Sequence, residues 1–151
     1  IYYGEEIGMQ GEKPDERIRE PFKWTADGSG MDTDWEDMLS NESTTALSEQ
    51  MEDEGSMYHY YKKLISVRKN SEALSKGKFE AIDAGSDDVM AYRRVSDSQT
   101  VYAVHNFTDE KATVKLPDAK GGKVIFTGSK KGTLSGDTIA LDAYASILIE
   151  K

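Results

Sequence analysis

Apolar and polar residues alternate in a series of short segments in the second half of the chain, after Gly77. Such alternation puts apolar side chains on one face of a β-strand, and clusters of turn-forming residues separate each segment from the next. Seven strands are predicted on this basis, at residues 78–82, 89–95, 100–107, 112–116, 123–128, 137–141 and 144–150. Short strands at this spacing are typical of an antiparallel β-sandwich.

One segment of the first half has helical periodicity instead. Met57, Tyr61, Leu64 and Ile65 recur at the spacing of one helix face, which predicts a helix that begins after Ser56. Its basic residues lie mostly toward its C-terminal end, where the helix dipole favours positive charge. This segment is the strongest helix signal in the chain.

The remainder of the first half is less regular. A shorter helix is predicted with Ser43 as its N-cap and Gly55 as its end. Residues 1–3, Ile-Tyr-Tyr, favour the end of a strand. Residues 4–42 have no sustained period and are rich in glycine and proline, which predicts a long loop, and long loops in compact domains are commonly functional.

The chain length suits one ordinary domain or two small ones, since it has 151 residues. The change of pattern near Gly77 predicts a division into residues 1–76 and residues 77–151. The second of these is expected to be all-β.

Charge and composition narrow the classes of partner. The chain has 28 acidic and 19 basic residues and a formal net charge of −9. Nucleic acids and anionic membranes attract basic patches, so we expect neither as a partner. The chain has no cysteine, which excludes disulfides and thiolate zinc sites. That absence fits the cytoplasm and bacterial secretion alike, and we favour a secreted bacterial protein.

The acidic segment DGSGMDTDWED invites a calcium interpretation, which its spacing does not support. An EF-hand loop needs oxygen ligands at positions 1, 3 and 5, glycine at position 6 and a carboxylate at position 12. A loop that starts at Asp27 has Met31 at position 5, and one that starts at Asp32 has Asp37 at position 6. We therefore expect a solvated acidic loop and no metal site.

The remaining candidates for chemistry are few. His59 and His105 have no partner at metal-ligand spacing and are interpreted as structural or surface residues. Glu5 and Glu6 are adjacent at a predicted strand end, so they should point to opposite faces and make a poor pair of catalytic carboxylates. Aromatic residues such as Trp24 can stack on sugar rings, but most aromatics at regular spacing belong to a core.

Three ordered motifs give the chain a family resemblance. Tyr-x-Gly-x-Glu occurs at Tyr2, Gly4 and Glu6, and Arg-x-Pro-Phe-x-Trp occurs at residues 19–24. Tyr-x-x-Leu-Ile-x-x-Arg follows at residues 61–68. Together they resemble the α-amylase family, glycoside hydrolase family 13, with bacterial α-amylases, oligo-1,6-glucosidases and neopullulanase-like enzymes as the nearest groups.

The resemblance implies an α+β fragment of a longer enzyme. It implies the last strand, loop and helices of a TIM-type (β/α)8 barrel, followed by a Greek-key antiparallel sandwich called domain C. The family's catalytic carboxylates would all precede Ile1, so no residue here is expected to be catalytic and the chain alone should be inactive. The implied partners are the rest of the barrel and an α-glucan or maltooligosaccharide substrate, with no cofactor and no metal.

The resemblance also suggests roles for individual residues. Arg19 and Trp24 are expected to bind substrate, while Glu6 and Gly4 are expected to support the site. For Arg19 a salt bridge that braces the loop is an equal alternative, and Trp35 is a second candidate for sugar stacking.

Two roles remain open for the sandwich. It can bind carbohydrate without catalysis, through Tyr92, Tyr102 or Tyr144, or it can serve as a structural cover for the barrel. We favour the structural role.

Overall fold

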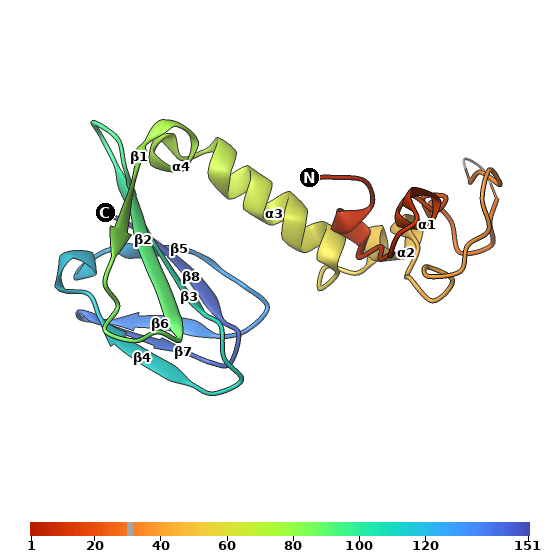
Figure 1. Cartoon of the computed structure of the whole chain (residues 1–151). Helices are drawn as coiled ribbons and strands as arrows, with labels where there is room; N and C mark the ends of the chain where they lie inside the picture. Colours follow the sequence, from red (N-terminus) through yellow and green to blue (C-terminus); the bar gives the residue numbers. More distant parts are fainter. Residues whose placement is uncertain (30–31) are drawn as a thin grey trace. The chain divides into compact units, whose positions relative to one another are not determined.

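The structure, a computed structural model, describes residues 1–29 and 32–151 of the chain. Met31, which is position 5 of the calcium loop considered from Asp27, therefore lies outside the described residues. The described chain divides into two compact units, Ile1–Lys63 and Leu64–Lys151 (Figure 1). The division into compact units does not test the predicted domain boundary near Gly77, which therefore stays a prediction.

Short helices joined by loops make up the first unit. They are the 3-10 helix η1 (Glu5–Ile7) and the α-helices α1 (Asp15–Ile18) and α2 (Leu47–Glu52). Helix α2 begins later than predicted, after Ala46 rather than Ser43, because the Glu49 carboxylate accepts a hydrogen bond from the Ala46 N–H at 3.1 Å and closes the first turn there. The helix ends at Glu52, before the predicted stop.

Residues 1–3 are not in a strand, so that prediction is wrong for this structure. A strand needs a neighbouring strand to take up its backbone hydrogen bonds, and in the described part of the chain no strand pairs with this segment. The chain turns at Gly4 and enters η1.

Helix α3 (Met57–Lys69) begins after Ser56, as predicted, and spans the division between the units. The Ser56 hydroxyl accepts a hydrogen bond from the His59 N–H at 3.3 Å, which is the expected N-terminal cap. None of its residues is buried, and its predicted apolar face includes Met57 at 48% and Ile65 at 38% exposure. The short helix α4 (Glu72–Lys76) follows and buries Ala73 and Leu74.

The second unit is an antiparallel β-sandwich, as the alternating pattern predicts. One sheet has five strands in the order β1-β2-β3-β8-β5, and the other has three in the order β4-β7-β6 (Figure 1). The strands are β1 (Lys78–Ile82), β2 (Val89–Val95), β3 (Thr100–Asn106), β4 (Ala112–Lys115), β5 (Lys123–Thr127), β6 (Gly132–Ser135), β7 (Thr138–Leu141) and β8 (Ser146–Glu150). The short 3-10 helix η2 (Pro117–Ala119) follows β4.

Seven of these strands are those predicted, and β6 was missed. Its sequence, Gly-Thr-Leu-Ser, offers a single large apolar residue, so it carries almost no alternation. The strand exists because it forms a hairpin with β7, in which Leu134 pairs with Ile139. Gly136, at a φ of 64°, makes the turn between the two strands.

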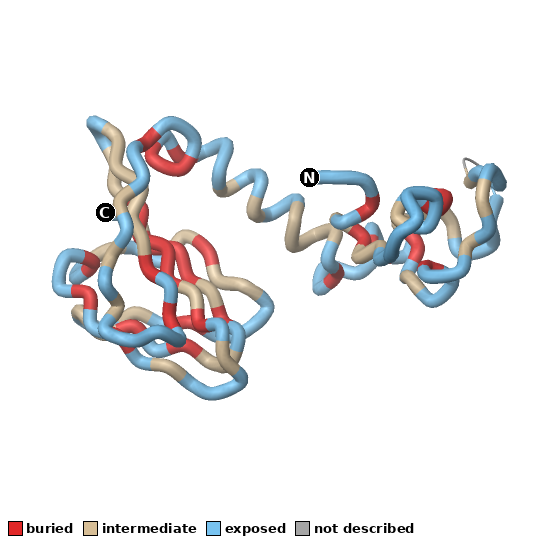
Figure 2. Tube along the Cα trace, in the orientation of Figure 1, coloured by how far each residue is buried: buried red, intermediate tan, exposed pale blue. Residues whose placement is uncertain are grey.

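The core of the sandwich lies between the two sheets. Buried strands appear side by side in this unit in Figure 2. The inward residues of β8 and β3, such as Ile147, Ile149 and Val104, have no exposed surface, and neither does Ile139 on the opposite sheet. Within β3 and β8 the residues of the core cluster recur with period 2, but Val101, Ala103 and Leu148 between them are buried as well, so burial in these two strands does not alternate.

Candidate functional site

All four residues assigned to a site by the sequence lie in the first unit. Gly4 has a φ of 77° and begins η1, where its carbonyl accepts hydrogen bonds from the N–H groups of Ile7 at 3.2 Å and Met9 at 3.0 Å. A side chain there would meet the backbone strain of the left-handed region, and its Cβ would clash with the Met9 side chain. Gly4 is therefore a structural requirement of this turn.

Glu6 lies one turn further, in η1. Its Oε2 atom is buried and, among the residues that the structure describes, has no hydrogen-bond partner. Burial raises the pKa of the Tyr61 hydroxyl, and the nearby charges of Glu5 and Glu6 raise it further. Glu5 and Glu6 lie in a 3-10 helix rather than at a strand end, so the strand alternation on which the expectation of opposite faces rested does not apply to them.

Arg19 is on the surface directly after α1. Its Nη2 lies 3.6 Å from the Asp15 carboxylate, and the side chains are 55% and 63% exposed. An ion pair this exposed contributes about 0–1 kcal/mol to stability because water and salt screen it. Both sequence-based alternatives for Arg19 remain compatible with this position: the loop-bracing pair is present, and much of the guanidinium is accessible.

Trp24 belongs to an aromatic row. Its ring centroid lies 4.5 Å from that of Phe22, which in turn packs edge-on against Tyr3 at 6.3 Å. The backbone N–H of Trp24 donates to the Asp32 carboxylate at 2.8 Å, which fixes the backbone of the tryptophan. Its ring is half-buried. Trp35, the second stacking candidate, is 53% exposed.

Glu20 is the central residue of this loop, and the sequence reasoning missed it. Its side chain has no exposed surface. Its carboxylate accepts hydrogen bonds from the N–H of Ser40 at 2.8 Å, the N–H of Asn41 at 3.0 Å and the Asn41 amide at 2.9 Å. Burial raises the pKa of Glu20, but these hydrogen bonds outweigh burial and lower it below 4.5.

Asn41 extends the same network. Its side chain bonds both backbone groups of Gln10, accepting from the N–H at 2.7 Å and donating to the carbonyl at 2.8 Å. The Glu20–Asn41 pair thus joins three loop segments far apart in sequence. The only available sequence signal was a charged residue between two motif residues, Arg19 and Pro21, and such a position usually indicates an exposed side chain.

A polar hollow of about 390 Å³ lies beside this network. Its wall includes two acidic residues, and both are already occupied by backbone groups: Glu49 accepts from Ala46 at 3.1 Å and Asp53 from Gly55 at 2.8 Å. The hollow therefore offers amide and hydroxyl groups for hydrogen bonding.

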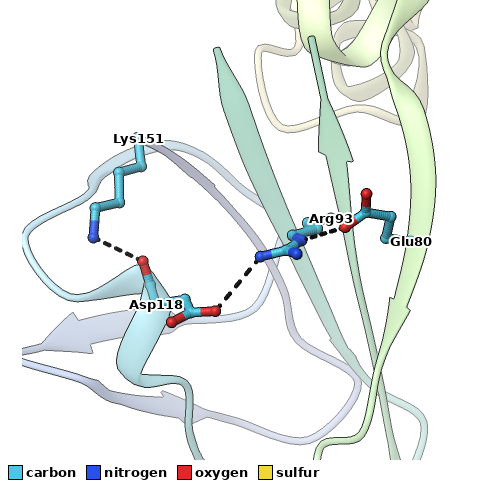
Figure 3. Close-up of polar contacts among 4 residues, drawn as sticks. All are labelled: Glu80, Arg93, Asp118 and Lys151. Atoms are coloured by element: carbon cyan, nitrogen blue, oxygen red, sulfur yellow. Dashed lines mark hydrogen bonds and ion pairs between the residues drawn. The ribbon is translucent and has the colours of Figure 1, made fainter. Parts of the chain in front are cut away.

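The second unit has a charged cluster at an edge of the sandwich, shown in Figure 3. Arg93 on β2 donates to Glu80 on β1 at 2.7 Å and to Asp118 on η2 at 3.5 Å, while Lys151 donates to the Asp118 carbonyl at 2.9 Å. These residues line or border a hollow of about 340 Å³. Arg93 ties the five-stranded sheet to the segment that follows β4, so we assign the cluster a structural role.

No three His, Asp or Glu side chains in residues 1–29 and 32–151 gather closely enough to hold a metal ion. No helix within the same ranges is both long and apolar enough to cross a membrane.

Both units match protein families of known type. Residues 1–77 match the family profile "Alpha amylase, catalytic domain", and residues 89–148 match "Alpha-amylase SusG C-terminal domain". The chain is 36% identical to Alpha-amylase 3 of Dictyoglomus thermophilum over 154 residues, covering 99% of the chain and 30% of that protein. It is 31% identical to a probable oligo-1,6-glucosidase 2 of Bacillus subtilis over 108 residues, covering 70% of the chain and 19% of that protein.

Among solved structures, the α-amylase from H. orenii superposes with a TM-score of 0.83 at 33% identity, covering 100% of this chain and 32% of that one. The chain thus spans less than a third of the length of these relatives.

Proposed function

The chain belongs to the α-amylase family, glycoside hydrolase family 13, and from this membership we propose that it is the C-terminal part of a retaining α-glucan hydrolase. The observation that carries the proposal is the order of the two profile matches. A catalytic-domain segment is followed directly by the C-terminal domain of an α-amylase, in a chain that spans 30% of an α-amylase relative. The proposed substrates are starch or maltooligosaccharides.

The chain itself is proposed to be inactive. A retaining mechanism needs two carboxyl groups about 5–5.5 Å apart on either side of the scissile bond, one as nucleophile and one as acid and base. From the family resemblance we propose that these groups precede Ile1. The hydrogen bonds of Glu20, Glu49 and Asp53 support this proposal, because each of these carboxylates is committed to backbone or amide donors.

We assign the first unit to the rim of the catalytic cleft. Arg19 would donate paired hydrogen bonds to sugar hydroxyls, and its exposure supports that role. Trp24 would present its ring to a glucose unit from a fixed backbone position. Glu20 and Asn41 would hold the loop that carries both residues, since their network joins its distant segments.

Glu6 supports the proposal that this unit adjoins more of a barrel. A buried carboxylate oxygen without a donor costs about 1–3 kcal/mol, so such atoms are rare in complete structures. A hydrogen-bond donor from the rest of the catalytic barrel would satisfy Oε2 of Glu6. We assign the sandwich a mainly structural role in that larger protein.

The first experiment compares the 151-residue chain with a longer protein that includes the catalytic barrel. The longer protein should hydrolyse starch or maltooligosaccharides, and the chain alone should not. Hydrolysis by the purified chain that disappears on Glu5→Gln or Glu6→Gln substitution would contradict the proposal.

The second experiment tests Arg19 in the longer protein, with Arg17→Ala as the matched control because Arg17 is also exposed in α1. Arg19→Ala should lower kcat/KM roughly 10- to 150-fold through lost hydrogen bonds of charged donors to the sugar. Its Tm should stay nearly unchanged. A lower Tm with kcat/KM intact would assign Arg19 to loop bracing instead.

A further inference from the structure

The turn between β2 and β3 contacts the short helix α4. This turn spans residues 96–99 and is closed by the Ser96 N–H, which donates to the Gln99 carbonyl at 2.9 Å. Helix α4 directly precedes β1 (Figure 1) and contacts both β2 and β3. The helix and the sandwich belong to the same compact unit, so the turn and α4 have a defined relative position.

The side chain of Gln99 completes the start of α4. Its amide oxygen accepts hydrogen bonds from the Ala73 N–H at 3.0 Å and from the Ser71 hydroxyl at 2.7 Å. The Ser71 hydroxyl in turn accepts from the Leu74 N–H at 3.1 Å, as the N-cap of the helix. The first N–H groups of a helix have no partner within the helix itself. One side chain from a turn more than 20 residues away therefore supplies an acceptor that α4 lacks.

Other side chains of the hairpin bond to α4 as well. The hydroxyls of Ser98 and Ser96 donate to the Glu72 carboxylate at 2.5 Å and 3.2 Å, and these bonds lower the pKa of Glu72. Arg94, at the end of β2, donates from Nε to the Ala73 carbonyl at 3.4 Å. The bonds to Glu72 are exposed and contribute little, because water competes for them. The two bonds to Gln99 are partly buried and are the stronger part of the contact.

Apolar burial accompanies these hydrogen bonds. Ala73 has no exposed surface and Leu74 is 8% exposed, although neither belongs to the apolar cluster between the two sheets. Val101 on β3 is also outside that cluster and has no exposed surface, while its neighbour Tyr102 belongs to the cluster. Adjacent residues of a strand point to opposite faces, so Val101 lies on the outer face of the five-stranded sheet. Since α4 contacts β3, the helix covers part of this outer face.

The end of α4 is held as closely as its beginning. The Gly77 N–H donates to the Ala73 carbonyl at 2.9 Å. A Cβ at Gly77 would clash with this carbonyl and with the carbonyl of Val95 at the end of β2, so glycine permits the close approach of helix and strand. The Arg68 guanidinium donates to the Leu74 carbonyl and thereby joins the end of α3 to α4.

The contact joins parts of the chain that match two different family profiles. The catalytic-domain profile covers residues 1–77 and therefore includes α4. The C-terminal-domain profile covers residues 89–148 and includes the β2–β3 hairpin. A helix of five residues is too short to be stable in water on its own. The last helix of the catalytic-domain match thus depends on the sandwich for its structure.

We propose that the turn at residues 96–99 is a clamp by which the sandwich holds the end of the catalytic domain. The central acceptor of the clamp is the Gln99 amide oxygen, and its partner is the start of α4 with its N–H and hydroxyl donors. The clamp keeps α4 folded and links the unfolding of the two domains. The clamp itself rests on the contacts of α4, whereas its role in a longer enzyme rests on the proposed function.

Hydrogen exchange on the 151-residue chain tests the clamp with two variants of one side chain. Gln99→Met keeps the length of the side chain and removes the acceptor oxygen, whereas Gln99→Glu keeps an acceptor. Gln99→Met should accelerate exchange at the Ala73 amide roughly 10- to 100-fold and leave β8 unchanged, because two hydrogen bonds are lost locally. Gln99→Glu should retain most of the protection. The matched control is Asp97→Ala, at an exposed position of the same turn, which should leave the Ala73 amide unchanged.

Three results would overturn the clamp. Unchanged exchange at Ala73 in Gln99→Met would show that the acceptor oxygen does not hold the helix. Equal acceleration in Gln99→Met and Gln99→Glu would show the same. Acceleration in Asp97→Ala as large as in Gln99→Met would assign the effect to the turn as a whole and not to the Gln99 side chain.

Calorimetry of the longer protein tests the link between the domains. Both domains should unfold in one transition, and Gln99→Met should separate it into two. An identical thermogram in Gln99→Met would refute the link. Hydrolysis assays on the same samples distinguish this result from the proposed function. Linked unfolding in a longer protein that hydrolyses no α-glucan would uphold the clamp and refute the enzyme proposal, and hydrolysis with an unaltered thermogram in Gln99→Met would do the reverse.

Discussion

The two units of the chain are stabilised by different kinds of contact. In the described part of residues 1–63, the buried apolar side chains are those of Ile7, Pro21 and Ala46, whereas four polar residues are buried there, namely Glu20, Asn41, Gln50 and Ser56. In residues 64–151 the ratio is reversed, and a continuous apolar cluster joins both sheets. The first unit relies on directed hydrogen bonds and the second on removal of apolar surface from water.

This difference has an energetic consequence. A typical hydrogen bond contributes about 0.5–1.5 kcal/mol net, because folding exchanges it for bonds to water. Burial of one large apolar side chain contributes about 1.5–3 kcal/mol. The sandwich therefore has the means to fold on its own, and the first unit needs additional burial. The exposed apolar face of α3 is consistent with that need.

The largest effect is expected from a substitution in the sandwich core. Ile139→Ala should destabilise the second unit by about 2–5 kcal/mol, because Ile139 has no exposed surface and its removal leaves a cavity between the sheets. Urea unfolding monitored by the far-ultraviolet circular dichroism of the β-sheets measures the change. Val124→Ala is the control, since Val124 is 37% exposed on β5 and should cost much less. Equal costs at the two positions would mean that the apolar core does not dominate.

A smaller effect is expected in the first unit from Glu20→Gln. The amide group of glutamine would direct N–H donors toward the N–H groups of Ser40 and Asn41, and the charge-assisted bonds would be lost, at a cost of about 2 kcal/mol. Hydrogen exchange at the amides of these two residues should accelerate roughly 30-fold, with the sandwich unaffected. The control is Glu12→Gln, at an exposed position of the same loop, which should change neither the stability of the first unit nor the exchange of these two amides. Unaltered exchange in Glu20→Gln would remove Glu20 as the centre of the loop.

The pH dependence of the second unit provides a third prediction. Burial lowers the pKa of His105 below 6.5, so the unfolded chain binds a proton more readily than the folded sandwich. The stability contributed by neutral His105 is therefore complete above pH 6.5 and is lost as the pH falls through the lower folded pKa. Urea midpoints at pH 7.5 and 5.5 should show this decline. In His105→Phe the decline should shrink, and an unchanged decline would contradict the assignment.

The sequence predicted the sandwich far better than the loops, for a physical reason. Alternating residues and the turn-forming residues between strands are local signals, so seven of the eight strands could be located from the sequence alone. Strand β6 escaped because Leu134 alone cannot define an alternation, and its pairing is decided by the hairpin with β7.

The candidate site could be predicted only in part. The motif residues Gly4, Glu6, Arg19 and Trp24 were found by resemblance, but the sequence could not reveal that Glu20 is buried. Its burial depends on donors about 20 residues away, at Ser40 and Asn41, and such a contact leaves no local pattern. The positive φ of Tyr144, 54°, was equally invisible in the sequence, because tyrosine seldom adopts that conformation.

Hydrogen exchange on the intact 151-residue chain tests the central claim most directly, namely that the sandwich is stable by itself and the first unit is not. The account predicts slow exchange in β3 and β8, with opening at the global unfolding free energy of the sandwich. It predicts much faster exchange throughout residues 1–63, with the N–H groups bonded to Glu20 among the slowest of that unit. Uniform protection across both units in a monomeric chain would contradict the account.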